Sequence, residues 1–215
     1  RSRGLGDVYK RQHYDSSRAY ILRSVEGSLK RLRTGYVDLL LIHRPDPLMD
    51  AAEIAAAFTE LRERGLVRFF GVSNFTPSQF DLLQSRLPFS LVTNQIECSV
   101  LQTEALDDGT LDACQRLGIA PMAWSPLGGG ALFDASSKRA SAVLRELAEI
   151  GKERGIGSID RLAIAWLRCH PANIVPVIGT GNPERIAESV AASGTDISRE
   201  DWFRILRASR GADVP

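Results

Sequence analysis

The stretch YVDLLLIH, Tyr36–His43, is a nearly continuous apolar run that ends on a histidine. A run of this kind predicts a β-strand buried on both faces, as in a parallel sheet. The segments on either side have a helical period instead. Ser16 or Ser17 can cap a helix before the strand, and the helix expected over Asp50–Arg64 is stopped by Gly65.

The alternation of strand and helix continues to the end of the chain. Further strands are predicted at Val67–Val72, Leu91–Ile96, Ile119–Trp124 and Ile174–Ile178, and further helices at Pro77–Arg86, Asp108–Leu117, Arg139–Arg154, Ser158–Cys169, Pro183–Ala192 and Arg199–Ser209. The first strands begin about 24–30 residues apart, the length of one βα unit. This pattern predicts an α/β fold with a parallel sheet, either doubly wound or a (β/α)₈ barrel. The first βα turn contains no GxGxxG, which argues against a Rossmann domain.

The composition is that of an ordinary globular chain. Its 215 residues include 27 basic and 26 acidic side chains, with a formal net charge of +1. A nearly neutral chain has no excess of positive charge that would favour binding to nucleic acid, and its apolar runs are too short to span a membrane. The three cysteines, Cys98, Cys114 and Cys169, form no CxxC pair. We therefore expect a cytoplasmic protein with no metal site and no nucleic-acid or membrane partner.

The first twelve residues, RSRGLGDVYKRQ, differ from the rest. Arg1–Gln12 has no helical or alternating period and carries four basic residues against the single acid Asp7. The string resembles a translated sequencing-library adapter, so we interpret it as a non-native leader. The alternative is a flexible basic arm. On the adapter interpretation, residues 13–215 are the C-terminal part of a single domain.

Polar or aromatic residues stand at the carboxyl end of each predicted strand. They are His43-Arg44-Pro45-Asp46, Ser73-Asn74-Phe75, Asn94-Gln95-Ile96-Glu97, Trp124-Ser125-Pro126-Leu127-Gly128 and Gly179-Thr180-Gly181. Because the carboxyl ends of parallel strands meet at one edge of a sheet, five such segments in succession predict the lining of a site.

The ordered motifs LLLIHRPD, GVSNF, TNQIE, WSPLGGG and VIGTGNPERI resemble those of the aldo-keto reductases, from about residue 13 to residue 215. The resemblance implies a (β/α)₈ TIM barrel that binds NADPH across its C-terminal face and reduces an aldehyde or ketone to the alcohol. It implies that this chain holds strands 4–8 with their helices and lacks the first three βα units. It also implies that the partner is a small-molecule carbonyl substrate and that the parent protein is a monomer.

Carried over residue by residue, the resemblance makes His43 the active-site histidine that hydrogen-bonds the substrate carbonyl. On its own, a lone histidine at a strand end is as readily a structural one. For NADPH, the resemblance places Ser73, Asn74 and Gln95 on the nicotinamide carboxamide, Trp124 against the nicotinamide ring, and Ser125, Leu127 and Gly128 along the pyrophosphate.

The resemblance places the adenosine end of the cofactor on the segment after the last strand. Thr180 and Arg185 would contact the 2′-phosphate, and Glu188 and Ser189 would approach the adenine. Gly179 and Ser189 replace a lysine and an asparagine that are common in the family, so the preference for NADPH rests mainly on Arg185. The alternative for Arg185 is a surface arginine paired with Glu184 or Glu188.

The family's chemistry also uses a tyrosine, a lysine and an aspartate from the first three βα units. The tyrosines and lysines of this chain are Tyr9, Tyr14, Tyr20, Tyr36, Lys10, Lys30, Lys138 and Lys152. None of these residues has a position that allows its assignment as the catalytic acid, so we expect the chain itself to be inactive. Because the missing strands would also have packed against the sheet, we expect Leu39, Leu41 and Val72 to be exposed or poorly packed. An alternative function is a nicotinamide-binding regulatory or partner-binding subunit of the potassium-channel β-subunit type. A phosphate-handling barrel would explain only the segment from Gly179 to Arg185.

Overall fold

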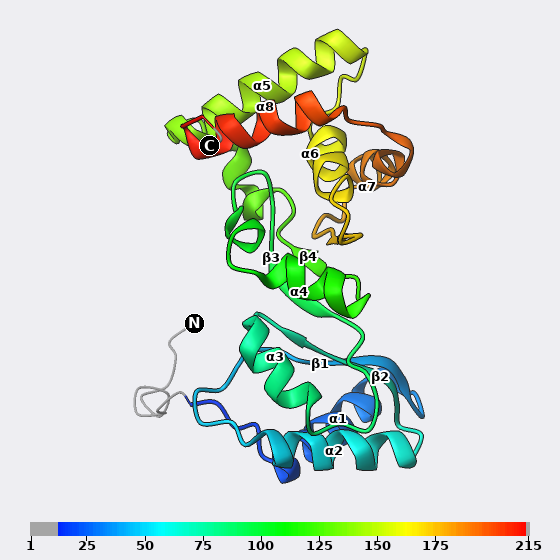
Figure 1. Ribbon diagram of the computed structural model, residues 1–215. Helices are drawn as coiled ribbons and strands as arrows, with labels where there is room; N and C mark the ends of the chain where they lie inside the picture. The colour runs from blue at the N-terminus through cyan, green and yellow to red at the C-terminus, as the bar shows by residue number, and fades with distance from the viewer. Residues whose placement is uncertain (1–12, 214–215) are drawn as a thin grey trace, which may run out of the picture.

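The computed structural model describes residues 13–213 (Figure 1), so the interpretation of Arg1–Gln12 as a leader lies outside it. The strands form one parallel sheet and are β1 (Val37–Ile42), β2 (Val67–Ser73), β3 (Asn94–Glu97), β4 (Met122–Trp124) and β5 (Val175–Val177). Their order in space is the order along the chain. A doubly wound sheet reverses its strand order at a switch point, and this sheet does not. The expected parallel α/β architecture is confirmed.

The helices are α1 (Arg18–Leu32), α2 (Ala51–Glu63), α3 (Pro77–Gln84), α4 (Thr110–Leu117), α5 (Lys138–Arg154), α6 (Ile159–Arg168), α7 (Pro183–Ala191) and α8 (Arg199–Arg210). Side-chain caps define their starts. Ser17 caps α1, Asp50 caps α2, and Thr76 forms a capping box with Gln79 at α3. No helix in this part of the chain is long and apolar enough to cross a membrane.

Two strands begin later than the sequence suggests. β3 begins at Asn94 rather than Leu91, and β4 begins at Met122 rather than Ile119. The residues before β3 already pair with β2, because the Val92 amide donates to the Phe70 carbonyl at 2.8 Å. The difference is therefore one of strand boundaries and not of topology.

The core consists of two clusters. The first lies between β1, β2 and helices α1–α3, where the rings of Phe58 and Phe70 are 4.4 Å apart. The second lies around β3, β4 and helices α5, α6 and α8. There the indoles of Trp166 and Trp202 stack at 4.8 Å, and each indole N–H donates to the backbone carbonyl of the other residue. Figure 1 shows α5 and α8 side by side, far from α1–α3.

The two faces of the sheet near β1 differ in burial. Phe70 and Val72 pack against helices and are fully buried, so the expectation that Val72 is poorly covered is wrong. On the other face Leu39 is 36% exposed and Phe69 is 55% exposed. The expectation that Tyr36–His43 is buried on both faces is therefore also wrong. Among the described residues β1 pairs only with β2, so its second edge has no partner strand there.

Candidate functional site

The carboxyl ends of the strands carry three cavities that contain most of the predicted site residues. The His43 cavity, between α1 and the end of β1, has a volume of about 320 Å³. The Trp124 cavity, over the ends of β2–β4, has about 280 Å³. The Arg185 cavity, between the loop after β4 and the segment after β5, has about 530 Å³.

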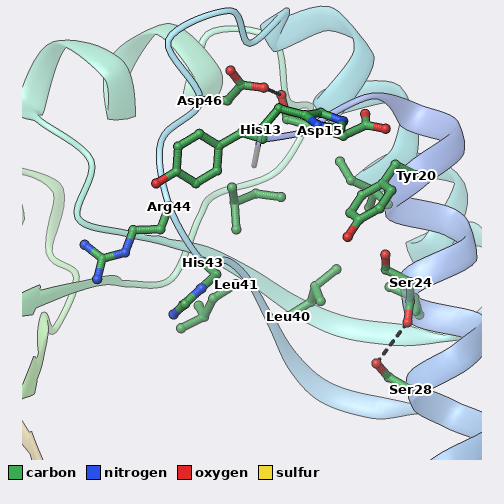
Figure 2. A pocket seen from close by; sticks show the side chains of 15 residues that line it. His13, Asp15, Tyr20, Ser24, Ser28, Leu40, Leu41, His43, Arg44 and Asp46 are labelled. Carbon is green, nitrogen blue, oxygen red and sulfur yellow. Dashed lines mark hydrogen bonds between the residues drawn. The ribbon is translucent and has the colours of Figure 1, made fainter. Parts of the chain in front are cut away.

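Figure 2 shows the side chains that line the His43 cavity. His43 directly follows β1, as predicted, and its side chain is exposed. Tyr20 and Ser24 of α1 lie across the cavity from it. Within residues 13–213, His43 has no hydrogen-bond partner, and no lysine lines this cavity. The described part of the chain therefore provides no tyrosine–lysine pair beside His43.

A chain of hydrogen bonds connects the ends of β2, β3 and β4. The Trp124 indole N–H donates to Asn74 Oδ1 at 2.9 Å, and Asn74 Nδ2 donates to Ser73 Oγ at 3.0 Å. Ser73 Oγ then donates to the Gln95 backbone carbonyl at 2.9 Å. Asn74 has φ 57°, a left-handed conformation that asparagine tolerates better than most residues. All four residues predicted for the nicotinamide end thus meet in one network.

The residues of this network differ in which of their polar atoms remain available for a hydrogen bond to a ligand. Ser73 is 3% exposed and its hydroxyl already makes two internal bonds, so its evident task here is to orient Asn74. The half-buried side-chain amide of Gln95 makes no hydrogen bond within the described residues. The whole Gln95 amide, and the second N–H of Asn74 Nδ2, can therefore bind a ligand without breaking an internal bond, although Gln95 itself lines none of the three cavities.

Arg44 is a site residue to which sequence reasoning gave no role. Its guanidinium carbon lies 6.0 Å from the centre of the Trp124 ring, and Arg44 lines both the His43 and Trp124 cavities. A cation at this distance is attracted to the face of an indole. The only signal in the sequence was the position of Arg44 directly after His43.

Backbone turns and small residues shape the Arg185 cavity. The loop expected at Pro126–Gly130 leads into η3 (Gly128–Phe133), a pair of short turns that meet at a kink, because Gly128, Gly129 and Gly130 have φ of 64°, 60° and 95°. These values favour glycine and let the backbone pass close to the cavity. Of the predicted cofactor residues, Ser125, Leu127, Thr180, Arg185 and Ser189 line this cavity, whereas Gly128 and Glu188 do not.

Arg185 stands in the first turn of α7 and is held from two sides. Its Nε donates to Asp160 Oδ2 at 2.6 Å, and its guanidinium carbon lies 5.7 Å from the centre of the Phe133 ring. The hydrogen bond to Asp160 holds the pKa of Arg185 above its ordinary value. Pairing with Glu184 or Glu188, the alternative considered from the sequence, does not occur. Asp160 and Phe133 are both residues that the sequence did not reveal.

Capping side chains occupy backbone N–H groups at the start of α7, so the donors that suit a phosphate group at this cavity are those of the Arg185 side chain. Asn182 caps α7 by accepting from the backbone N–H groups of Glu184 and Arg185, and Thr180 Oγ1 accepts from the Asn182 backbone N–H. Neither Nη1 nor Nη2 of Arg185 makes a hydrogen bond to any described residue. A guanidinium with free terminal nitrogens is the usual bidentate partner of phosphate. The side-chain amide of Gln95, further along the same edge, likewise makes no hydrogen bond to a described residue, whereas the Trp124 indole N–H is already bonded to Asn74.

The fold and this site define an α/β protein whose ligand groups follow one edge of a parallel sheet. A profile of the Aldo/keto reductase family matches residues 6–210. The chain therefore belongs to the aldo/keto reductase family. The match begins inside the twelve residues interpreted above as a leader.

Known proteins of the family are similar over most of the chain. Oxidoreductase YdhF of Escherichia coli is 51% identical over 94% of this chain and 67% of the relative, which confirms the resemblance stated from the motifs. A 6-dehydroglucose reductase of Agrobacterium fabrum is 47% identical over the same shares, 94% and 67%. Among solved structures, the thermostable aldo-keto reductase Tm1743, in complex with the inhibitor epalrestat, has 33% sequence identity to this chain. That match has a TM-score of 0.80 and covers 89% of this chain and 67% of that one.

Proposed function

We propose that this protein carries the cofactor site and the substrate-orienting histidine of an NADPH-dependent reductase, which converts an aldehyde or ketone to the alcohol. The observation that carries the proposal is the arrangement of three groups along one sheet edge. These groups are His43, the Asn74–Trp124 network and Arg185. They occur in this order in a chain of the aldo/keto reductase family.

The cofactor would extend from the Trp124 cavity to the Arg185 cavity. Asn74 and Gln95 would hold the carboxamide, with Ser73 fixing Asn74. Trp124 would provide the flat surface for the nicotinamide ring, and the segment Ser125–Gly128 would follow the pyrophosphate. Thr180 and Arg185 would take the 2′-phosphate, with Glu188 and Ser189 near the adenine. When bound, NADPH supplies a hydride to the carbonyl carbon of the substrate.

His43 would donate an imidazole N–H to the substrate carbonyl oxygen. This bond orients the carbonyl and strengthens as negative charge grows on the oxygen. Its exposed position at the end of β1 leaves it accessible to a small molecule. The oxygen must then receive a proton. Tyr14 and Tyr20 line the cavity, but no lysine in residues 13–213 accompanies them to lower a tyrosine pKa.

We therefore propose that the residue that protonates the substrate oxygen lies in a larger barrel, of which the described sheet is one part. The five strands would be strands 4–8 of a (β/α)₈ barrel, and the tyrosine, lysine and aspartate would come from its first three βα units. In support, the strand order has no reversal, β1 has an open edge, and the chain covers 67% of the length of YdhF. The 215-residue chain alone would then bind cofactor without reducing a carbonyl.

The other expectations remain proposals of the same kind. The partner would be a small carbonyl compound, the complete protein a monomer, and its location the cytoplasm, where the unpaired Cys98, Cys114 and Cys169 stay reduced. The relatives lend no support to a regulatory subunit of the potassium-channel β-subunit type.

The decisive experiment has two stages. NADPH and NADH are titrated into the 215-residue chain, and the binding is followed by calorimetry and by quenching of tryptophan fluorescence. We expect NADPH to bind more tightly than NADH. The complete protein is then tested for NADPH oxidation with a panel of carbonyl compounds. The panel includes 6-dehydroglucose, because one relative is named a 6-dehydroglucose reductase. Binding of neither nucleotide would overturn the proposal.

A further inference from the structure

Asp160 is the one residue that hydrogen-bonds the Arg185 side chain within the described part of the chain. The bond joins Arg185 Nε to Asp160 Oδ2 at 2.6 Å. The Asp160 side chain is only 13% exposed, whereas that of Arg185 is 44% exposed. The carboxylate is therefore the fixed partner of the pair, and the guanidinium is the part that it restrains.

The placement of Asp160 makes it a rigid anchor. It lies in the first turn of α6, which is capped by Ser158, and a helix N-terminus favours a negative charge. Arg185 lies in the first turn of α7, and Phe133 belongs to η3. Side chains from two other elements thus contact the guanidinium at the wall of the Arg185 cavity.

The geometry divides the donors of the guanidinium into two sets. Asp160 occupies Nε, the inner donor, while the four N–H bonds of Nη1 and Nη2 make no hydrogen bond to a described residue. A free arginine loses several rotamers when it binds an anion, and this loss weakens binding. A side chain already held through Nε and over the Phe133 ring has less freedom to lose.

We infer that Asp160 is a positioning residue that holds Arg185 with its terminal nitrogens free for the 2′-phosphate, and so strengthens the preference for 2′-phosphorylated nucleotides. The inference rests on the proposed function. Asp160 also carries a negative charge close to the phosphate position, and this charge opposes binding. The two effects predict opposite results when Asp160 is changed, so they can be separated by experiment.

The experiment compares two ligands that differ only in the 2′-phosphate, adenosine 2′,5′-bisphosphate and adenosine 5′-monophosphate. Calorimetry measures the affinity of the 215-residue chain for each, and the ratio of the two affinities is the readout. Asp160→Ala removes the anchor. Asp160→Asn keeps an oxygen that can accept from Nε but removes the charge. Glu184→Ala is the matched control, because this exposed carboxylate in the same turn as Arg185 makes no ion pair in the structure.

We expect Asp160→Ala to lower the ratio roughly three- to tenfold, the effect of freeing one long side chain. Asp160→Asn should keep most of the wild-type ratio, and Glu184→Ala should keep all of it. A general loss of stability would weaken both ligands together and leave the ratio unchanged. An unchanged or increased ratio in Asp160→Ala would overturn the inference, because repulsion would then equal or exceed positioning.

Arg185→Ala separates this inference from the proposed function. If Arg185→Ala abolishes the preference for the 2′-phosphate and Asp160→Ala does not lower it, only the role of Asp160 fails. If Arg185→Ala leaves the preference intact, or wild type binds neither nucleotide, the cofactor assignment itself fails.

Discussion

The Arg185 cavity and the His43 cavity lie at opposite ends of the same sheet edge, and they are built differently. At the Arg185 end, side chains from η3, α6 and α7 contact one another. At the His43 end, an exposed histidine follows a strand that has one neighbour in the described sheet. Leu39 of that strand remains 36% exposed. The side chains at the Arg185 end thus contact one another, whereas His43 makes no hydrogen bond within residues 13–213.

This difference separates two parts of the proposed function. The groups for binding a phosphate come from neighbouring segments, residues 125–189, and hold each other in place without outside help. On our proposal the groups for chemistry include an acid that β1 and α1 do not supply, because His43 orients the carbonyl and no lysine lies beside Tyr14 and Tyr20 in that cavity. Cofactor binding should therefore be a property of the chain, and catalysis a property of the complete barrel.

The largest expected effect comes from completing the His43 end. On our proposal, the part of YdhF outside the matched region provides the missing βα units. Fusing it to residues 13–215 should raise carbonyl reduction by about 10²–10⁴-fold, the usual contribution of a positioned acid. The measurement is NADPH oxidation with a reactive aldehyde. Equal rates for the chain and the fusion would contradict the comparison, since the His43 end would then be complete already.

In the same fusion, His43→Ala should lower kcat/KM for carbonyl reduction by on the order of 10²-fold. The affinity for NADPH, measured by calorimetry, should change little, because His43 lies in a different cavity from Arg185. His43→Gln retains an N–H donor and should recover part of the rate. If cofactor affinity falls as far as turnover, His43 is a structural residue.

The sequence predicted what short-range signals determine. The cap offered at Ser16 or Ser17 and the stop at Gly65 lie next to the helices that they define, so the order of strands and helices could be read from the sequence. The same holds for His43 and Trp124, whose places at strand ends follow from that order.

Contacts between distant segments could not be predicted in this way. Asp160 and Arg185 are 25 residues apart, and their pairing depends on how α6 packs beside α7. Arg44 reaches Trp124 only because β1 and β4 belong to one sheet. The exposure of Leu39 depends on which strands neighbour β1, and an apolar run does not contain that information.

At the Arg185 end, Arg185→Ala should weaken NADPH binding by about 1.5–3 kcal/mol, the range for a charge-assisted hydrogen bond, and hardly affect NADH. Calorimetry with both nucleotides measures the difference. Arg185→Lys keeps the charge but loses the planar fork, so its loss should be intermediate. Equal losses for NADPH and NADH would remove Arg185 from the 2′-phosphate.

The smallest effect concerns Trp124, which stands between the two ends. Trp124→Phe keeps an aromatic surface but removes the indole N–H that Asn74 Oδ1 accepts at 2.9 Å. This bond lies within the protein, so its loss acts on the cofactor only by releasing Asn74 and should weaken binding by about 0.5–1.5 kcal/mol at most, the value of one neutral hydrogen bond. Because the nicotinamide is common to both cofactors, NADPH and NADH should weaken equally, in contrast to Arg185→Ala. Trp124→Ala, which also removes the ring, should cost more. A loss confined to NADPH would mean that Trp124 acts at the phosphate end, and the two ends would then not be independent.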